Sequence, residues 1–208
     1  MIDKVVTLAV TGASGSLYFI HLLKNLLLAD VKVNLLLSSA AKIVIKTELN
    51  IDLPEAAHDI KEFLLNYFSD DLDAVDYSAS LLNIYGKEEW TSPVASGSNP
   101  AYAMVVCPCS MGTLSAISQG ASNNLIERAA DVILKEQRQL ILLPREMPFS
   151  TIHLENMLKL SRMGVTIMPA SPGFYQQPES IDDLVSFVVA RILDHLQIEH
   201  TLGMPWGN

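Results

Sequence analysis

Residues 5–16 read VVTLAVTGASGS, and this stretch decides how the chain is organised. Its first six residues are β-branched or apolar, as in a strand of a parallel sheet that is covered on both faces. Gly12 and Gly15 then allow a sharp turn and let a ligand approach the main chain. Apolar residues at helical spacing follow from Leu17, so the stretch predicts a strand, a tight loop and a helix.

The N–H groups that open such a helix have no partner within it, so we expect them to hold an anion such as a phosphate. The alternative is a strand-to-helix turn with no ligand. The glycine spacing is not that of a dinucleotide fold, and the second predicted strand, 32–37, ends in Ser38 and Ser39 rather than in an acidic residue for a ribose. The pattern therefore favours a mononucleotide such as FMN, with the Ser14 and Ser38 hydroxyls at one sheet edge.

The composition bounds the class of protein. The chain has 208 residues, 50% of them hydrophobic and 18% charged, with a net charge of −9. We expect one flavin-binding α/β domain over 1–208 with a short tail from about 199, and apolar surface buried between subunits. The acidic balance argues against nucleic acid. We find neither a signal pattern nor a run of about 18 apolar residues, which predicts a cytoplasmic protein without a membrane span.

Strand and helix patterns alternate along the chain. Strands are predicted at 32–37, 81–85, 102–107, 139–143 and 165–168, and helices at 17–29, 40–48, 59–68, 123–137, 152–163 and 181–196. This order predicts a three-layer Rossmann-like (flavodoxin-like) fold, with a mostly parallel sheet and helices on both faces.

A second junction of the same kind follows the strand at 102–107, where residues 108–114 read PCSMGTL. Ligands of a doubly wound sheet sit outside the carboxyl ends of its strands, so both loops should face one ligand. Cys107 and Cys109 are interpreted as small apolar residues at a strand end, because the chain has no further cysteine to complete a zinc site.

Two further groups of charged residues stand out. Arg145 and Glu146 follow a strand and lie between prolines, in a loop position typical of functional sites. Arg128, Asp131 and Lys135 fall on one polar side of a predicted helix, where a solvated ladder of ion pairs is the alternative to a site.

Taken together, these segments resemble the UbiX-type flavin prenyltransferases, within the homo-oligomeric flavin-containing decarboxylase-like flavoproteins. The resemblance covers about residues 5–198. It is carried by residues 11–15 (TGASG), 96–98 (SGS), 108–114 (PCSMGTL), 128–132 (RAADV), 134–136 (LKE), 144–146 (PRE), 153–157 (HLENM) and 174–175 (FY).

The resemblance implies transfer of the dimethylallyl group of dimethylallyl phosphate to N5 and C6 of reduced FMN, without a metal. The product, prenylated FMN, would serve as the cofactor of a UbiD-type decarboxylase. The resemblance also implies that the chain forms a homo-oligomer, namely a dodecamer. The sequence lacks the paired Asp-rich motif that holds magnesium on a diphosphate, which agrees with a metal-independent reaction.

The resemblance also implies roles for individual residues. Ser14, Glu48 and Glu146 would move protons, and the Trp90 ring would stabilise an allylic cation. The expected FMN-binding residues are Gly12, Ala13, Ser14, Ser38, Ser110, Met111, Gly112, Thr113 and Arg145. The expected substrate-binding residues are Arg128, Lys135, Arg145, Tyr175 and Arg191, some of them supplied by neighbouring subunits.

Two alternatives remain open at this point. One is an FMN-dependent cysteine-type decarboxylase of the same fold, which needs a catalytic histidine shortly after the first helix. His58 is a poor match, because it lies in an acidic, irregular part of the sequence. The other is a flavin carrier without catalysis.

Overall fold

The apolar strands pair into a single six-stranded sheet in the computed structural model, which describes residues 4–70 and 79–203. The strands are β1 (Val5–Val10), β2 (Lys32–Leu37), β3 (Leu82–Tyr85), β4 (Ala103–Cys109), β5 (Gln139–Pro144) and β6 (Thr166–Ile167). Their order is β3-β2-β1-β4-β5-β6 and every pairing is parallel. This is the strand order of a doubly wound fold.

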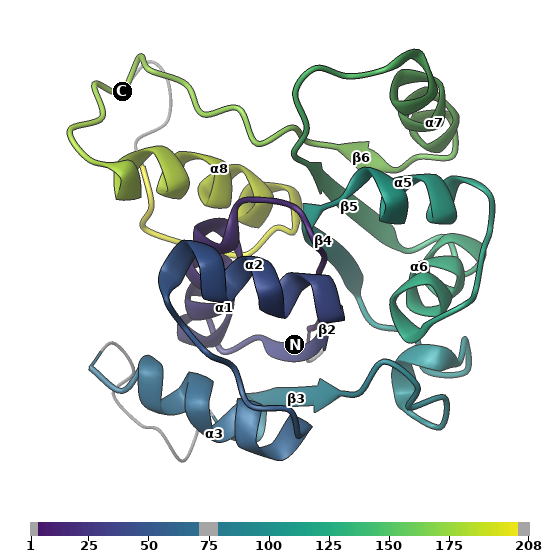
Figure 1. Cartoon of the computed structure of the whole chain (residues 1–208), viewed down its shortest axis with the longest axis horizontal. Coiled ribbons are helices and arrows are strands. Elements are labelled where there is room, and N and C mark those ends of the chain that lie inside the picture. Colours follow the sequence, from purple (N-terminus) through teal and green to yellow (C-terminus); the bar gives the residue numbers. More distant parts are fainter. Residues whose placement is uncertain (1–3, 71–78, 204–208) are drawn as a thin grey trace.

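Helices cover both faces of this sheet (Figure 1). Their bounds are α1 (Ser16–Leu28), α2 (Ser39–Leu49), α3 (Ala57–Tyr67), α5 (Met111–Ser118), α6 (Leu125–Lys135), α7 (Thr151–Arg162) and α8 (Ile181–His195), with a 3-10 turn η1 (Pro93–Ala95). One buried cluster joins the sheet to α1, α3 and α8, and another joins its other face to α5, α6 and α7. The predicted three-layer α/β fold is confirmed.

Successive strand residues feed opposite layers, as the pleat requires. Val105 packs with α1 and α8, whereas its neighbour Val106 packs with α5 and α6. Both faces of the sheet are therefore buried. This explains why the strands are mainly apolar throughout instead of alternating between apolar and polar residues.

The predicted ends of these elements lie within two residues of the observed ones, and two of the differences have a clear physical cause. The fourth strand continues to Cys109 rather than ending at Cys107, because its partner β5 still pairs there. The helix predicted at 123–137 covers only Leu125–Lys135, since the Asn124 side chain caps it by accepting from Glu127 N at 3.0 Å. Of the tail expected at 199–208, residues 204–208 lie outside the described part.

The strand order reverses between β1 and β4, and this places the loops that follow them side by side. Thr11 joins the two loops: its Oγ1 donates to Pro108 O at 2.9 Å and accepts from Ser110 N at 2.8 Å. In doubly wound sheets this switch point is the position of the ligand crevice.

Candidate active site

A cavity of about 370 Å³ lies at the switch point, outside the carboxyl ends of β1, β4 and β5. Its walls come from the loops after these strands and from α2. The lining residues are Gly12, Ala13, Ser14, Val44, Thr47, Glu48, Ser110, Met111, Arg145 and Glu146. Eight of these ten were predicted from the sequence, and the fold brings them together from three loops, from α2 and from the first residue of α5.

The loop after β1 depends on its glycines. Gly15 precedes α1 with φ of 123°, a conformation that side chains with a Cβ rarely adopt. A Cβ on Gly12 would lie 2.5 Å from the Ala40 Cβ, so only glycine lets α2 approach the loop this closely. The close approach is what places the α2 residue Glu48 at the start of α1.

The Glu48 carboxylate occupies the amino end of α1. It accepts from Ser16 N at 2.8 Å and from Gly15 N at 3.1 Å. Burial opposes the charge, but hydrogen bonds from Ser14, Ser16 and Gly15 outweigh it, so the pKa of Glu48 is lowered. The expectation that a phosphate takes these amides is therefore corrected: in this structure a carboxylate of the chain itself uses them.

The loop after β4 ends in the amino terminus of α5. Ser110 Oγ accepts from Thr113 N at 3.3 Å and donates to Thr113 Oγ1 at 3.1 Å. A Cβ on Gly112 would meet no atom within 4 Å, so there is open space beside this helix terminus. Serine and threonine hydroxyls, a small residue and a helix terminus suit the polar parts of a mononucleotide.

The loop after β5 supplies a cation and a carboxylate side by side. Arg145 and Glu146 are both exposed and line the cavity. Arg145 N donates to Cys109 O at 3.4 Å, and Glu146 Oε1 accepts from Met147 N at 3.1 Å. The backbone thus ties this loop to β4, while the charged groups face the cavity.

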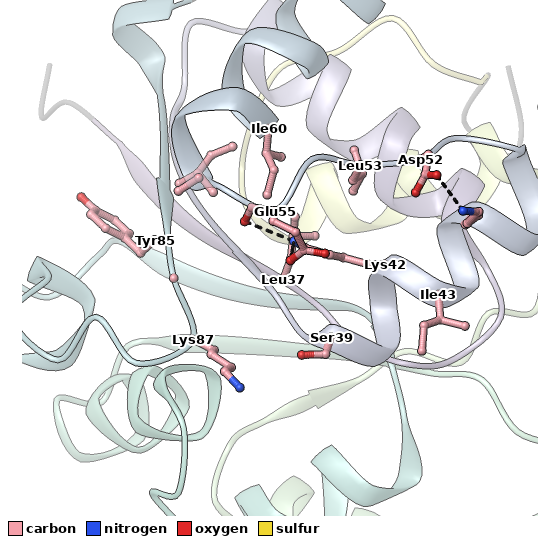
Figure 2. A pocket seen from close by; sticks show the side chains of 14 residues that line it. Leu37, Ser39, Lys42, Ile43, Asp52, Leu53, Glu55, Ile60, Tyr85 and Lys87 are labelled. Atoms are coloured by element: carbon pink, nitrogen blue, oxygen red, sulfur yellow. Dashed lines mark hydrogen bonds and ion pairs between the residues drawn. The ribbon is translucent and has the colours of Figure 1, made fainter.

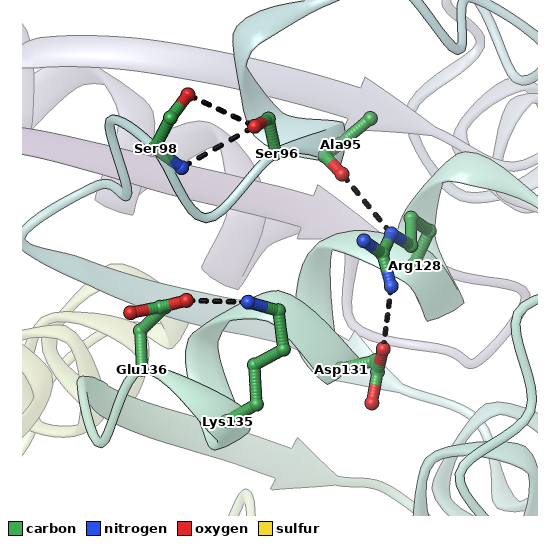
Figure 3. A network of polar contacts seen from close by, with 7 residues as sticks. All are labelled: Ala95, Ser96, Ser98, Arg128, Asp131, Lys135 and Glu136. Carbon is green, nitrogen blue, oxygen red and sulfur yellow. Dashed lines mark hydrogen bonds and ion pairs between the residues drawn. The ribbon is translucent and has the colours of Figure 1, made fainter.

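Arg128 and Lys135 lie elsewhere, on α6 (Figure 3). Arg128 donates to Asp131 at 2.7 Å and to Ala95 O at 3.0 Å, whereas Lys135 pairs with Glu136 rather than with Asp131. Lys135 ends α6 shortly before β5 begins, so it lies at the amino edge of the sheet, opposite the cavity. The 96–98 turn packs there: Figure 3 shows Ser96 and Ser98 in contact, their hydroxyls 3.0 Å apart.

Tyr175 and Arg191 line a third region, a cleft of about 1130 Å³ beside α8. Trp90 is 46% exposed in the loop after β3, and Ser38 caps α2 by accepting from Ala41 N at 3.0 Å. Several predicted site residues of one chain therefore do not line the cavity at the switch point. They are the cations of α6 and α8, together with Ser38, Trp90, Gly112 and Thr113.

Another crevice, of about 600 Å³, lies beyond the carboxyl ends of β2 and β3 (Figure 2). No predicted site residue lines it. Its lysines face carboxylates: Lys42 pairs with Glu55 at 3.0 Å and Lys46 with Asp52 at 2.6 Å. Two of its lysines are thus already paired with carboxylates.

Sequence reasoning missed three residues of the site. Val44 lies one helical turn before Glu48 and Thr47 directly before it, and the spacing of Val44 from Glu48 is the signal that could have found it. Thr11 belongs to the motif at 11–15, but the sequence assigned it no role. Its hydrogen bonds to Pro108 and Ser110 join the two loops and are tertiary contacts that no local pattern encodes.

The cysteines and histidines add no further chemistry to this cavity. Burial raises the pKa of the Cys109 thiol to about 12, and Cys107 is likewise buried, as expected for inert core residues. His58 is exposed on α3 and pairs with Glu62 at 3.1 Å. Over residues 4–70 and 79–203, no three His, Cys, Asp or Glu side chains are grouped to hold a metal ion.

Comparison with known proteins identifies the family. Residues 2–193 match the flavoprotein family model. The flavin prenyltransferase UbiX of Pseudomonas aeruginosa is 52% identical over 202 residues, which cover 97% of this chain and 93% of the relative.

Solved structures agree. The "dodecameric FMN-dependent Ubix-like Decarboxylase from Escherichia coli O157:H7" has a TM-score of 0.81 and 40% identity, covering 99% of this chain and all of that one. AnUbiX (PadA1), solved with FMN and dimethylallyl pyrophosphate, has a TM-score of 0.77 and 35% identity, covering 98% of this chain and all of that one. This chain therefore belongs to the flavoprotein family, among the UbiX flavin prenyltransferases.

Proposed function

We propose that this protein is a flavin prenyltransferase that joins the dimethylallyl group of dimethylallyl phosphate to N5 and C6 of reduced FMN. The observation that carries the proposal is the cavity at the switch point, where Ser14, Glu48, Ser110, Arg145 and Glu146 meet. The cavity offers hydroxyls, a hydrogen-bonded carboxylate, an exposed carboxylate and a guanidinium around one space. The chain belongs to the family of the flavin prenyltransferases.

FMN fits the residues of this cavity. The small residues Gly12 and Ala13 line it, and the start of α5 has open space beside Gly112. The Ser110 hydroxyl, which is hydrogen-bonded to Thr113 just behind the cavity wall, suits polar groups of the flavin. Reduced FMN supplies the nucleophilic atoms N5 and C6. The hydrogen bonds that lower the pKa of Glu48 favour its ionised form, and through them the carboxylate orients Ser14 and the α1 terminus.

Glu146 is the candidate general acid or base. It is exposed at the cavity, one residue from Arg145, whose charge suits the leaving phosphate. The allylic C–O bond would break as the bond to N5 forms, and the phosphate would leave with the bonding electrons. The bond to C6 would form as the prenyl double bond takes up a proton and C6 gives up its hydrogen as a proton. A cation beside the phosphate lowers the energy of that charge separation, and a carboxylate accepts the proton that alkylation releases.

Neighbouring copies of the chain complete this site in our proposal. Arg128 and Lys135 lie on α6, and Tyr175 and Arg191 lie beside α8, so one chain does not gather them around the cavity. Apolar side chains such as Met147 (86% exposed) and Ile152 (66% exposed) stand near the Arg145 loop, as in surfaces that pack between subunits. We propose a homo-oligomer, a dodecamer like the Escherichia coli relative.

Prenylated FMN is released to a UbiD-type decarboxylase in this proposal. The cysteine-decarboxylase alternative is disfavoured because, among the described residues of one chain, those that line the cavity include no histidine. Over residues 4–70 and 79–203, none of the helices is long and apolar enough to cross a membrane.

The deciding experiment is the mass of the flavin after anaerobic incubation of the protein with reduced FMN and dimethylallyl phosphate. A gain of one dimethylallyl unit, with release of inorganic phosphate, is the expected result. Unchanged flavin mass with FMN bound would support a carrier instead. Carbon dioxide from a cysteine-terminated peptide or from phosphopantothenoyl-cysteine would support a decarboxylase. A parallel reaction with dimethylallyl diphosphate tests the preferred phosphate.

A further inference from the structure

The cleft beside α8 contains a chain of polar contacts that ends on Arg191. Arg191 Nη1 donates to Asp194 Oδ2 at 2.6 Å, and His200 Nε2 lies 3.1 Å from Asp194 Oδ1. Each oxygen of the Asp194 carboxylate therefore has a partner, one on α8 and one on the segment that follows it. Tyr175 lines the same cleft.

The tautomer of His200 follows from its other nitrogen. Leu202 N donates to His200 Nδ1 at 3.1 Å, and a backbone N–H can only donate, so Nδ1 carries no proton. In the neutral ring the proton is then on Nε2, which donates to Asp194. The His200 side chain is only 14% exposed, so its ring is held in place, whereas Asp194 and Arg191 are about half exposed.

The turn after α8 explains why these residues meet. Gln197 adopts φ of 53°, and Ile198 N donates to Leu193 O at 3.0 Å, which closes the helix and reverses the chain. Gln139 Nε2 donates to His195 O at 2.9 Å, which fixes the helix end to the sheet. These backbone contacts thus hold the end of α8 and the turn after it in place. The His200 ring follows this turn and contacts Asp194, which lies one helical turn after Arg191.

We propose that Asp194 and His200 are positioning residues for Arg191, holding its guanidinium so that the remaining N–H groups point to a phosphate. The contact to Asp194 uses Nη1, and the planar fork of Arg191 has further donors for an anion. The imidazole of His200, which is only 14% exposed, holds the other oxygen of the Asp194 carboxylate in place. Contact with this fixed carboxylate restricts the arginine side chain before binding, so less rotamer freedom is lost when the phosphate binds. This inference rests on the proposed function, in which Arg191 binds the substrate phosphate.

The test compares Asp194→Ala and His200→Ala with the wild-type oligomer, with His200→Gln as the conservative variant because its amide N–H can replace Nε2. His58→Ala and Glu62→Ala are matched controls, since they remove an exposed His–carboxylate contact of 3.1 Å on α3. We measure KM for dimethylallyl phosphate and kcat at saturation. We expect roughly a 10-fold rise in KM for Asp194→Ala, several-fold for His200→Ala and partial rescue in His200→Gln, with kcat within about threefold.

A readout without turnover separates this inference from the proposed function. Titration calorimetry of the FMN-loaded oligomer with inorganic phosphate should show weaker binding in Asp194→Ala and in Arg191→Ala by a similar factor, roughly 10-fold. That comparison stands even if the flavin mass never changes. Asp194→Asn serves if the alanine variant does not fold. Phosphate affinity and KM within twofold of wild type in the Asp194 variants would overturn the proposal. A lower KM would also overturn it, because it would mean that the carboxylate competes with the substrate for Arg191.

Discussion

Replacing Glu48 by Gln should lower the stability of the protein, because Glu48 is the anion at the amino end of α1. The amide keeps the size of the side chain but removes its charge from the Gly15 and Ser16 N–H groups, which lie 3.1 Å and 2.8 Å from Oε2. An anion at a helix amino end contributes about 0.3–1 kcal/mol at exposed sites and up to about 2 kcal/mol in partly buried ones. Since Glu48 is exposed and solvent screens it, we expect ~1 kcal/mol, or a fall in Tm of about 2–4 °C for a chain of this size.

The pH dependence has a definite sign. The folded-state pKa of Glu48 is lowered: burial alone would raise it, but the hydrogen bonds from Ser14, Ser16 and Gly15 outweigh that. The folded protein therefore holds the proton less tightly than the unfolded chain. The stabilisation is fully present above the unfolded pKa and is lost as pH falls through the folded one. The Tm difference between wild type and Glu48→Gln should thus persist at the ordinary glutamate pKa of 4.5 and shrink only below it.

The assay is thermal unfolding by circular dichroism at matched oligomer concentration, since association shifts Tm. Glu55→Gln is the control: that carboxylate is 96% exposed and pairs with Lys42 at 3.0 Å, so we expect a change within about 1 °C. Equal Tm values for wild type and Glu48→Gln near neutral pH would refute the reasoning. So would a difference that stays constant well below pH 4.5.

Three further predictions concern the site. Glu146→Gln should keep FMN bound but slow single-turnover prenyl transfer by about 10²–10⁴-fold, followed anaerobically by absorbance and product mass; a rate within about threefold of wild type at saturating substrate would leave Glu146 without a proton-transfer role. The double variant Ser110→Ala, Thr113→Ala should weaken FMN binding in a fluorescence titration, because it removes both hydroxyls at the start of α5; unchanged affinity would remove this loop from the FMN site. Light scattering at micromolar protein should give the mass of a large homo-oligomer, and a monomer mass would contradict a site completed by neighbouring subunits.

Much of the fold could be predicted from local pattern. Mainly apolar segments such as 32–37 predicted a parallel sheet covered on both faces, and β2 has the predicted bounds. The glycines of the first loop are equally local, since the turn at Gly15 needs a φ of 123°. Helix ends were less exactly predicted. The first residue of α6 is set by the Asn124 side chain, which caps the helix there although the helical pattern was predicted from residue 123.

The use of each site residue was decided by tertiary structure. The sequence placed Ser14, Ser110 and Arg145 at strand ends, and because the carboxyl ends of parallel strands meet at one edge, it could predict that they converge. It could not show that Glu48, near the end of α2, would accept hydrogen bonds from the α1 amides that were expected to bind phosphate. Nor could it show that Thr11 would join two loops. The opposite positions of Lys135 and Arg145 do follow from the sequence, because one precedes β5 and the other follows it. Local pattern sets backbone conformation and burial, whereas the partner of a charged side chain depends on residues that only folding brings near it.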